Sequence, residues 1–158
     1  MRGRKPKPTH LKLVSGNAGR RPLNSAEPKH ALSIPSPPHE LSDDAKVEWG
    51  RVADRLYRAG TLTEVDRAAL GAYCQAYGRW IHAERTLAKM AENDKATGGL
   101  LIKTSNGNAI QNPLVGIANK AAADMVRYAA EFGMTPSARS RIKAEGAPNE
   151  DEADQFFA

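Results

Sequence analysis

The sequence predicts a mainly α-helical protein, built from a helical hairpin and a third long helix with a small β-hairpin inserted between helices. Apolar residues recur at helical spacing in three stretches, and turn residues around an Asn-Gly pair separate the second stretch from the third. Both ends of the chain are rich in Pro, Gly or charge. We therefore expect a flexible arm over 1–38, a helical core over 39–145 with the β-hairpin at about 99–111, and a disordered acidic tail over 146–158.

The two helices of the predicted hairpin have recognisable start and stop signals. Ser42 begins the first helix and Gly60 ends it. Thr63 and Asp66 then have the spacing of a capping box, which begins a second helix that runs to about Asn93. Because only a short turn separates these helices, they should pack as a helical hairpin or a helix-turn-helix corner.

The second helix carries two apolar stripes rather than one. At roughly 28 residues it is about 40 Å long, which is more than the rest of a short chain easily covers. We expect one stripe to pack on the chain's own helices and the other on a neighbouring subunit. The residues expected at that subunit contact are Tyr73, Tyr77, Trp80 and Ile81. A helix lying wholly inside a monomeric bundle is the alternative.

Turn and capping residues define the second half of the core. The pair Asn106-Gly107 suits a two-residue type I′ turn between two short strands, which should lean on a helix or on a neighbouring subunit. Asn112-Pro113 begins the third helix, which Gly133 ends. A short basic helix then follows.

Charge is concentrated at the two ends of the chain. Residues 1–30 carry eight Lys and Arg against one acid, whereas residues 145–158 carry five acids and no base. A basic arm favours a polyanionic partner and an acidic tail favours a basic one, with two merely solubilising ends as the alternative. The candidate phosphate contacts are Arg2, Arg4, Lys5, Lys7, Lys12, Arg20 and Arg21 in the arm, and Arg139, Arg141 and Lys143 in the short basic helix.

The acidic tail combines four carboxylates with two terminal aromatic residues, which suits docking on a basic, partly apolar surface of another protein. The candidate partner-binding residues are Glu150, Asp151, Glu152, Asp154, Phe156 and Phe157. A tail without function is the alternative.

The sequence offers no catalytic or metal site. Cys74 is the only cysteine and lies on an apolar stripe, as expected for a buried hydrophobic side chain. Three of the four histidines lie in the arm and His82 is alone on a helix, so neither a metal-ligand set nor a catalytic triad can be assembled. No phosphate-binding loop or membrane-spanning run is present. We expect a soluble intracellular protein that is not an enzyme and needs no cofactor.

Several motifs occur in an order typical of one protein family. They are the N-terminal run GRKPKPTHLKLVSGN at residues 3–17, the Asn-Gly hairpin before Asn112-Pro113-Leu114, and the closing run FGMTPSAR at residues 132–139. Over roughly residues 3–143 the chain resembles one branch of the small terminase subunits of tailed bacteriophages. The acidic tail lies outside this resemblance.

The resemblance implies a DNA-packaging initiation factor. Such subunits form homo-oligomeric rings, bind viral double-stranded DNA, and recruit and regulate the large terminase subunit, which carries the ATPase and nuclease. We expect nine subunits, located in the cytoplasm of the bacterial host and not in the mature virion. The alternative is a helix-turn-helix regulator that binds its operator as a dimer. Against it, the second helix is long and rich in Ala and aromatic residues, rather than in exposed Asn, Gln and Arg.

Overall fold

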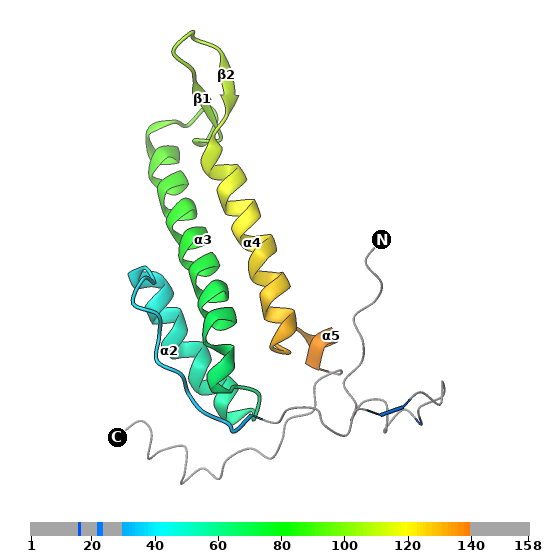
Figure 1. Ribbon diagram of the computed structural model, residues 1–158. Helices are drawn as coiled ribbons and strands as arrows, with labels where there is room; N and C mark the ends of the chain where they lie inside the picture. The colour runs from blue at the N-terminus through cyan, green and yellow to red at the C-terminus, as the bar shows by residue number, and fades with distance from the viewer. Residues whose placement is uncertain (1–15, 17–21, 24–29, 140–158) are drawn as a thin grey trace. The chain divides into compact units, whose positions relative to one another are not determined.

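The computed structural model describes residues 16, 22–23 and 30–139 of the chain. The chain divides into two units, Met1–Ala31 and Leu32–Ala158, and the architecture below is that of the described part of the second. Its elements are α2 (Asp43–Arg58), the 3₁₀ turn η1 (Glu64–Asp66), α3 (Arg67–Asn93), β1 (Leu101–Lys103), β2 (Ala109–Gln111), α4 (Pro113–Glu131) and the short α5 (Pro136–Arg139) (Figure 1). The predicted mainly α-helical fold with an inserted β-hairpin is confirmed.

The helices begin and end where local chemistry satisfies their terminal backbone groups. The Thr63 N–H donates to the Asp66 carboxylate at 3.0 Å, as the predicted capping box requires. The Asn112 side chain accepts a hydrogen bond from the Leu114 N–H at 3.0 Å, and Pro113 occupies the first turn of α4. Ser42 is the N-cap residue of α2, although its side chain makes no capping hydrogen bond.

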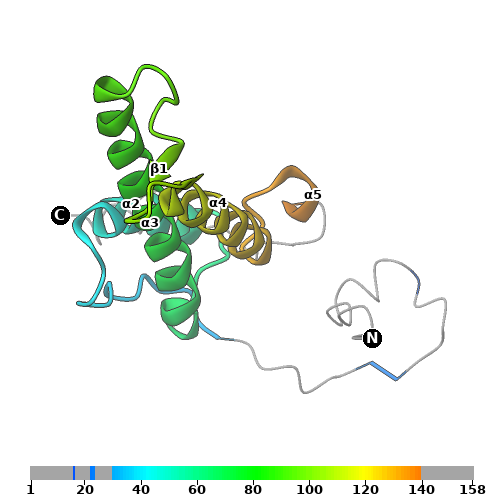
Figure 2. The same cartoon turned by 90° about the horizontal axis from the view of Figure 1, so that it is seen from above.

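α3 lies between α2 and α4, as both views show (Figures 1 and 2). The main core fills the space around the amino-terminal half of α3. It consists of buried residues from α2, from the segments on either side of it, from α3 and from the end of α4, namely Leu41, Ala45, Trp49, Val52, Ala53, Leu56, Tyr57, Leu62, Leu70, Tyr73, Cys74 and Phe132. Both neighbours of α3 in this structure are thus helices of the same chain.

A glycine allows α2 to approach α3 closely. A Cβ atom placed on Gly78 would lie 2.5 Å from the Ser42 Oγ and 3.3 Å from the Ala45 Cβ. Because these distances are shorter than ordinary contacts, a larger residue at this position would require the Ser42 side chain to move and the backbone near Ala45 to shift.

The segment before α2 packs on the core, although the sequence predicts a flexible arm up to residue 38. Leu32 pairs with Thr63 in an isolated β-bridge, and the Ser33 N–H donates to the Leu62 carbonyl at 3.2 Å. Pro35 is fully buried. The end of the predicted arm, from residue 32 onward, is therefore in contact with the helices.

The β-hairpin stands at the far end of the α3–α4 pair (Figure 1), with Ile102 opposite Ile110. The Thr104 N–H donates to the Asn108 carbonyl and the Gly107 N–H to the Thr104 carbonyl, both at 2.9 Å. The connection therefore has three residues, and the prediction of a two-residue turn is wrong. Gly107 has a φ of 81°, as the last residue of such a three-residue loop requires.

Asn112 ties the base of the hairpin to the helices. Its buried amide donates to the Gly99 carbonyl at 2.8 Å, while its own N–H donates to the Leu100 carbonyl at 2.8 Å. One side chain thus caps α4 and holds the chain as it enters the hairpin.

Candidate functional site

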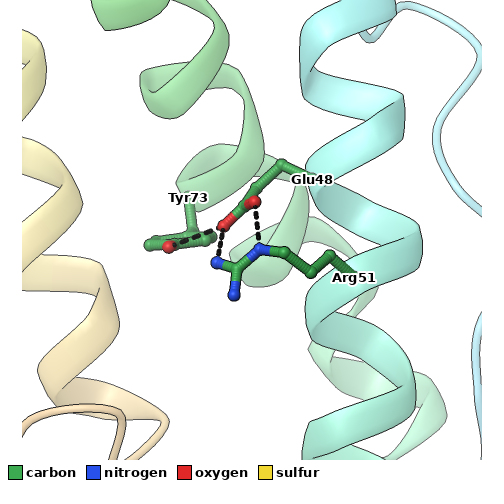
Figure 3. Close-up of polar contacts among 3 residues, drawn as sticks. All are labelled: Glu48, Arg51 and Tyr73. Atoms are coloured by element: carbon green, nitrogen blue, oxygen red, sulfur yellow. Dashed lines mark hydrogen bonds and ion pairs between the residues drawn. The ribbon is translucent and has the colours of Figure 1, made fainter.

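A charged cluster lies in the core between α2 and α3 (Figure 3). The Glu48 side chain is only 2% exposed. Arg51, one turn further along α2, donates from Nε to Glu48 Oε2 at 2.6 Å and from Nη2 to Oε1 at 2.5 Å. From α3, the Tyr73 hydroxyl donates to Glu48 Oε1 at 3.0 Å. The buried hydrogen bond from Tyr73 therefore links α3 to α2, while Arg51, whose side chain is 48% exposed, neutralises the same carboxylate from within α2.

The electrostatics of this cluster are those of a structural link. The hydrogen bond to Glu48 raises the pKa of Arg51 above its ordinary value. Burial, assisted by the hydrogen bond to Glu48, raises the pKa of Tyr73 to about 12. Burial likewise raises the pKa of the neighbouring Cys74 thiol to about 12. At neutral pH the thiol is protonated and enclosed, so Cys74 is not an activated nucleophile.

The four residues predicted at a subunit contact do not share one environment. Tyr73 is 8% exposed and belongs to the chain's own core, where Glu48 is its partner. Tyr77, Trp80 and Ile81 are half-buried. The rings of Tyr77 and Trp80 meet edge to face with centroids 6.0 Å apart.

At about 100° per residue, Tyr77, Trp80, Ile81 and Glu84 occupy one side of α3, which we call the aromatic side. The Trp80 indole N–H donates to the Glu84 carboxylate at 3.1 Å on the surface. This side carries apolar area that the chain covers only in part.

Most of the predicted DNA-binding and partner-binding residues lie outside the described residues. Arg139 is the exception: it is exposed in the last turn of α5. The residues about which the structure says nothing are Arg2, Arg4, Lys5, Lys7, Lys12, Arg20, Arg21, Arg141, Lys143, Glu150, Asp151, Glu152, Asp154, Phe156 and Phe157. These assignments stay predictions.

The structure draws attention to a surface that sequence reasoning missed. Roughly opposite the aromatic side, α3 presents a row of polar residues, which we call the basic stripe: Arg79, His82, Thr86, Lys89 and Asn93. Arg79, His82 and Lys89 are exposed. Within residues 30–139, neither Arg79 nor Lys89 has an ion-pair partner. The spacing of three and four residues, with no acid, was the signal available in the sequence.

A groove between α3 and α4 adjoins the basic stripe. It has a volume of about 560 Å³ and is lined by Ala76, Arg79, Pro113, Gly116, Ile117, Lys120, Ala121 and Asp124. Asp124 pairs with both Lys120 at 3.2 Å and Arg127 at 3.0 Å. Ile117 is 47% exposed. The groove is thus lined by small and apolar residues together with two cations, Arg79 and Lys120, and one acid, Asp124.

The described part of the chain holds neither a metal-ligand cluster nor a membrane-spanning helix. Among its residues, no three His, Cys, Asp or Glu side chains lie close enough together to hold a metal ion. None of the helices in that same part is both long and apolar enough to cross a membrane.

Comparison with known proteins gives one finding. Residues 45–149 match the family described as phage terminase, small subunit. The matched segment runs from the first turns of α2 through α5. It does not include the N-terminal motif at residues 3–17. Neither curated proteins nor solved structures give a match.

Proposed function

Because this chain belongs to the phage terminase small-subunit family, we propose that it is a ring-forming, DNA-binding protein that initiates packaging of a viral genome. It engages viral double-stranded DNA and recruits and regulates the large terminase subunit, which carries the ATPase and nuclease. The observation that carries this proposal is the family match over residues 45–149. In this proposal the protein has no catalysis of its own, requires no cofactor, and acts in the cytoplasm of the host cell.

Apolar surface on two sides of the subunit supports assembly into a ring. Val47 on α2 is 75% exposed, and Val126 and Ile117 on α4 are 63% and 47% exposed. These helices flank α3 (Figures 1 and 2). A ring needs two different surfaces on every subunit, because each subunit contacts one neighbour with each surface. We propose that the aromatic side of α3 joins one of these contacts and that nine subunits close the ring.

The distribution of charge supports two further partners. Seven Lys and Arg residues in the first 21 residues of the chain can neutralise phosphates, and a ring brings many copies of them to one DNA molecule. The acidic tail with its two phenylalanines is proposed to dock on the large subunit. Each copy would bind weakly, whereas a ring would bind well through its several tails.

The test is DNA binding by fluorescence anisotropy over a series of salt concentrations. The full chain should bind duplex DNA with an affinity that falls steeply as salt rises, and deletion of residues 1–21 should weaken binding and flatten that dependence. Absence of binding by the full chain would contradict the proposal. An unchanged slope after the deletion would remove the arm as the DNA-contacting segment.

A companion truncation tests the tail. Ending the chain at Pro148 should leave assembly and DNA affinity nearly unchanged and reduce stimulation of the large subunit's ATPase. If truncation tightens DNA binding at low salt instead, the tail inhibits by covering the basic arm. If neither property changes, the tail only confers solubility.

A further inference from the structure

We infer that the basic stripe of α3 is a second DNA-contacting surface, built into the folded core and directed at the phosphate backbone of duplex DNA. This inference rests on the proposed function and adds to it a site separate from the N-terminal arm and from α5. The stripe comprises Arg79, His82, Thr86, Lys89 and Asn93.

Several cations on the described helices are paired with acids, whereas those of the stripe are not. Arg51 pairs with Glu48, Arg58 with Asp54, and Arg85 bridges from α3 to Asp44 at 2.8 Å. On α4, Lys120 and Arg127 share Asp124. Arg79 and Lys89 differ, because within residues 30–139 no carboxylate pairs with either. They can contact a phosphate without first breaking an ion pair.

The stripe is arranged so that its long cations stand clear of its short polar residues. The Thr86 hydroxyl donates to the His82 carbonyl at 2.8 Å, and the Asn93 amide donates to the Lys89 carbonyl at 3.3 Å. These two short side chains are therefore held against the helix, while the longer cations project from it. Arg79 and Lys89 are ten residues apart, or about 15 Å along the axis, a length of roughly four nucleotides of one DNA strand.

The composition of the stripe favours DNA over a protein partner. Protein interfaces are commonly anchored by Trp, Tyr or Arg side chains in well-packed pockets. The stripe has no aromatic residue, and its one arginine is exposed. Aromatic residues lie on the opposite, aromatic side of α3, at Tyr77 and Trp80. A row of cations and small polar groups instead fits a phosphate backbone, and it provides contacts that do not depend on base sequence.

Positive charge also lies beside the stripe. Arg79 lines the groove between α3 and α4, where Lys120 is a second cation. Asp124 lines the same groove and pairs with Lys120 and Arg127, so the three cations Arg79, Lys120 and Arg127 outnumber this one carboxylate. The positive surface thus continues from α3 onto α4.

The experiment compares two double variants of the full chain that each remove two exposed cations. Arg79→Gln/Lys89→Gln alters the stripe. Arg55→Gln/Lys95→Gln is the matched control, because Arg55 and Lys95 are exposed, lie off the stripe, and have no ion-pair partner among the described residues. Binding to a fluorescein-labelled duplex of about 30 base pairs and arbitrary sequence is measured by anisotropy at several salt concentrations. Light scattering checks that the oligomeric mass is unchanged.

The stripe variant should bind at least about tenfold more weakly, and the slope of log affinity against log salt should fall by about two for each subunit that contacts the duplex, one for each phosphate that the subunit no longer neutralises. The control variant should keep a DNA affinity and a salt dependence close to those of the parent. If both variants lose the same DNA affinity, or if the stripe variant binds DNA as tightly as the parent, the inference is wrong and the proposed function stands. A lower oligomeric mass would place the stripe in a subunit contact and also overturn the inference. Failure of the parent to bind DNA would reject the proposed function and this inference together.

Discussion

The buried carboxylate of Glu48 should be a major determinant of how firmly α2 is held on α3. Replacing Glu48 with Ala removes the acceptor for Arg51 and for the Tyr73 hydroxyl. Breaking a buried ion pair by deleting one partner costs about 3–5 kcal/mol. The Arg51 side chain is 48% exposed, so its guanidinium can turn to water and reduce that cost.

The Tyr73 hydroxyl cannot turn to water in the same way. Tyr73 is only 8% exposed, and an unsatisfied buried hydroxyl costs about 1–3 kcal/mol. We therefore expect Glu48→Ala to lower the free energy of unfolding by about 3 kcal/mol, the low end of the range for a broken buried pair. Tyr73→Phe removes the hydroxyl and its bond together, leaves Glu48 paired with Arg51, and should cost about 1 kcal/mol.

The assay is urea unfolding followed by far-ultraviolet circular dichroism. Protein concentration must be held fixed, because assembly contributes to apparent stability. The double variant Glu48→Ala/Tyr73→Phe should lose less than the two single losses added, since the orphaned hydroxyl is then absent. A Glu48→Ala variant within about 1 kcal/mol of the parent, or strict additivity, would refute the role assigned to the buried carboxylate.

Three more outcomes are expected. Folding raises the pKa of Tyr73 from 10.0 and of Cys74 from 9.0, each to about 12. As pH rises, the unfolded chain therefore loses these protons before the folded chain does, which favours unfolding. The thermal unfolding midpoint should fall between pH 9 and 12, and below pH 9 these two groups should not affect it. If the midpoint of Tyr73→Phe falls as steeply as that of the parent, Tyr73 is excluded as a cause. Asn112→Ala removes the cap of α4 and the hydrogen bond to the Gly99 carbonyl. It should lower the free energy of unfolding by about 2 kcal/mol and speed amide hydrogen exchange in the β-hairpin. Exchange as slow as in the parent would contradict the anchoring role of Asn112. Tyr77→Glu should preserve helical circular dichroism but lower the oligomeric mass, because burying an unpaired charge in a packed subunit contact is costly. An unchanged mass would place Tyr77 outside the subunit contact.

Local signals were enough to place the helices. Gly60, the pair Thr63 and Asp66, and Asn112 act through hydrogen bonds or backbone angles within a few residues, so their effect can be predicted without knowing the tertiary structure. Glu48 also carried a signal, because it lies on the same face of α2 as Ala45 and Trp49. A carboxylate on an apolar face indicates a buried partner, but the sequence does not identify which residue supplies it.

The packing partners of α3 and the register of the two strands were harder to predict. A helical period shows that α3 has two apolar stripes, yet it cannot show that α2 and α4 both come from the same chain and that Tyr73 is enclosed between them. Similarly, Asn106-Gly107 is compatible with a two-residue turn and with the three-residue loop observed. The choice depends on the register that the two strands adopt.

The basic stripe was hard to recognise for a related reason. Its significance depends on which cations find acidic partners in the folded chain, and pairs such as Arg85 with Asp44 join residues far apart in sequence. Only when those pairs are known can Arg79 and Lys89 be recognised as cations that share one side of α3 and have no ion-pair partner among the described residues.

Assembly into a ring is the claim on which the proposed packaging role depends most. The most direct measurement is the molar mass of the full chain by multi-angle light scattering, taken across a range of protein concentrations. Ring formation predicts a single large species of about nine times the 17.1 kDa chain mass, stable on dilution. A monomer at all concentrations would contradict ring formation, and a stable dimer would favour the helix-turn-helix regulator instead.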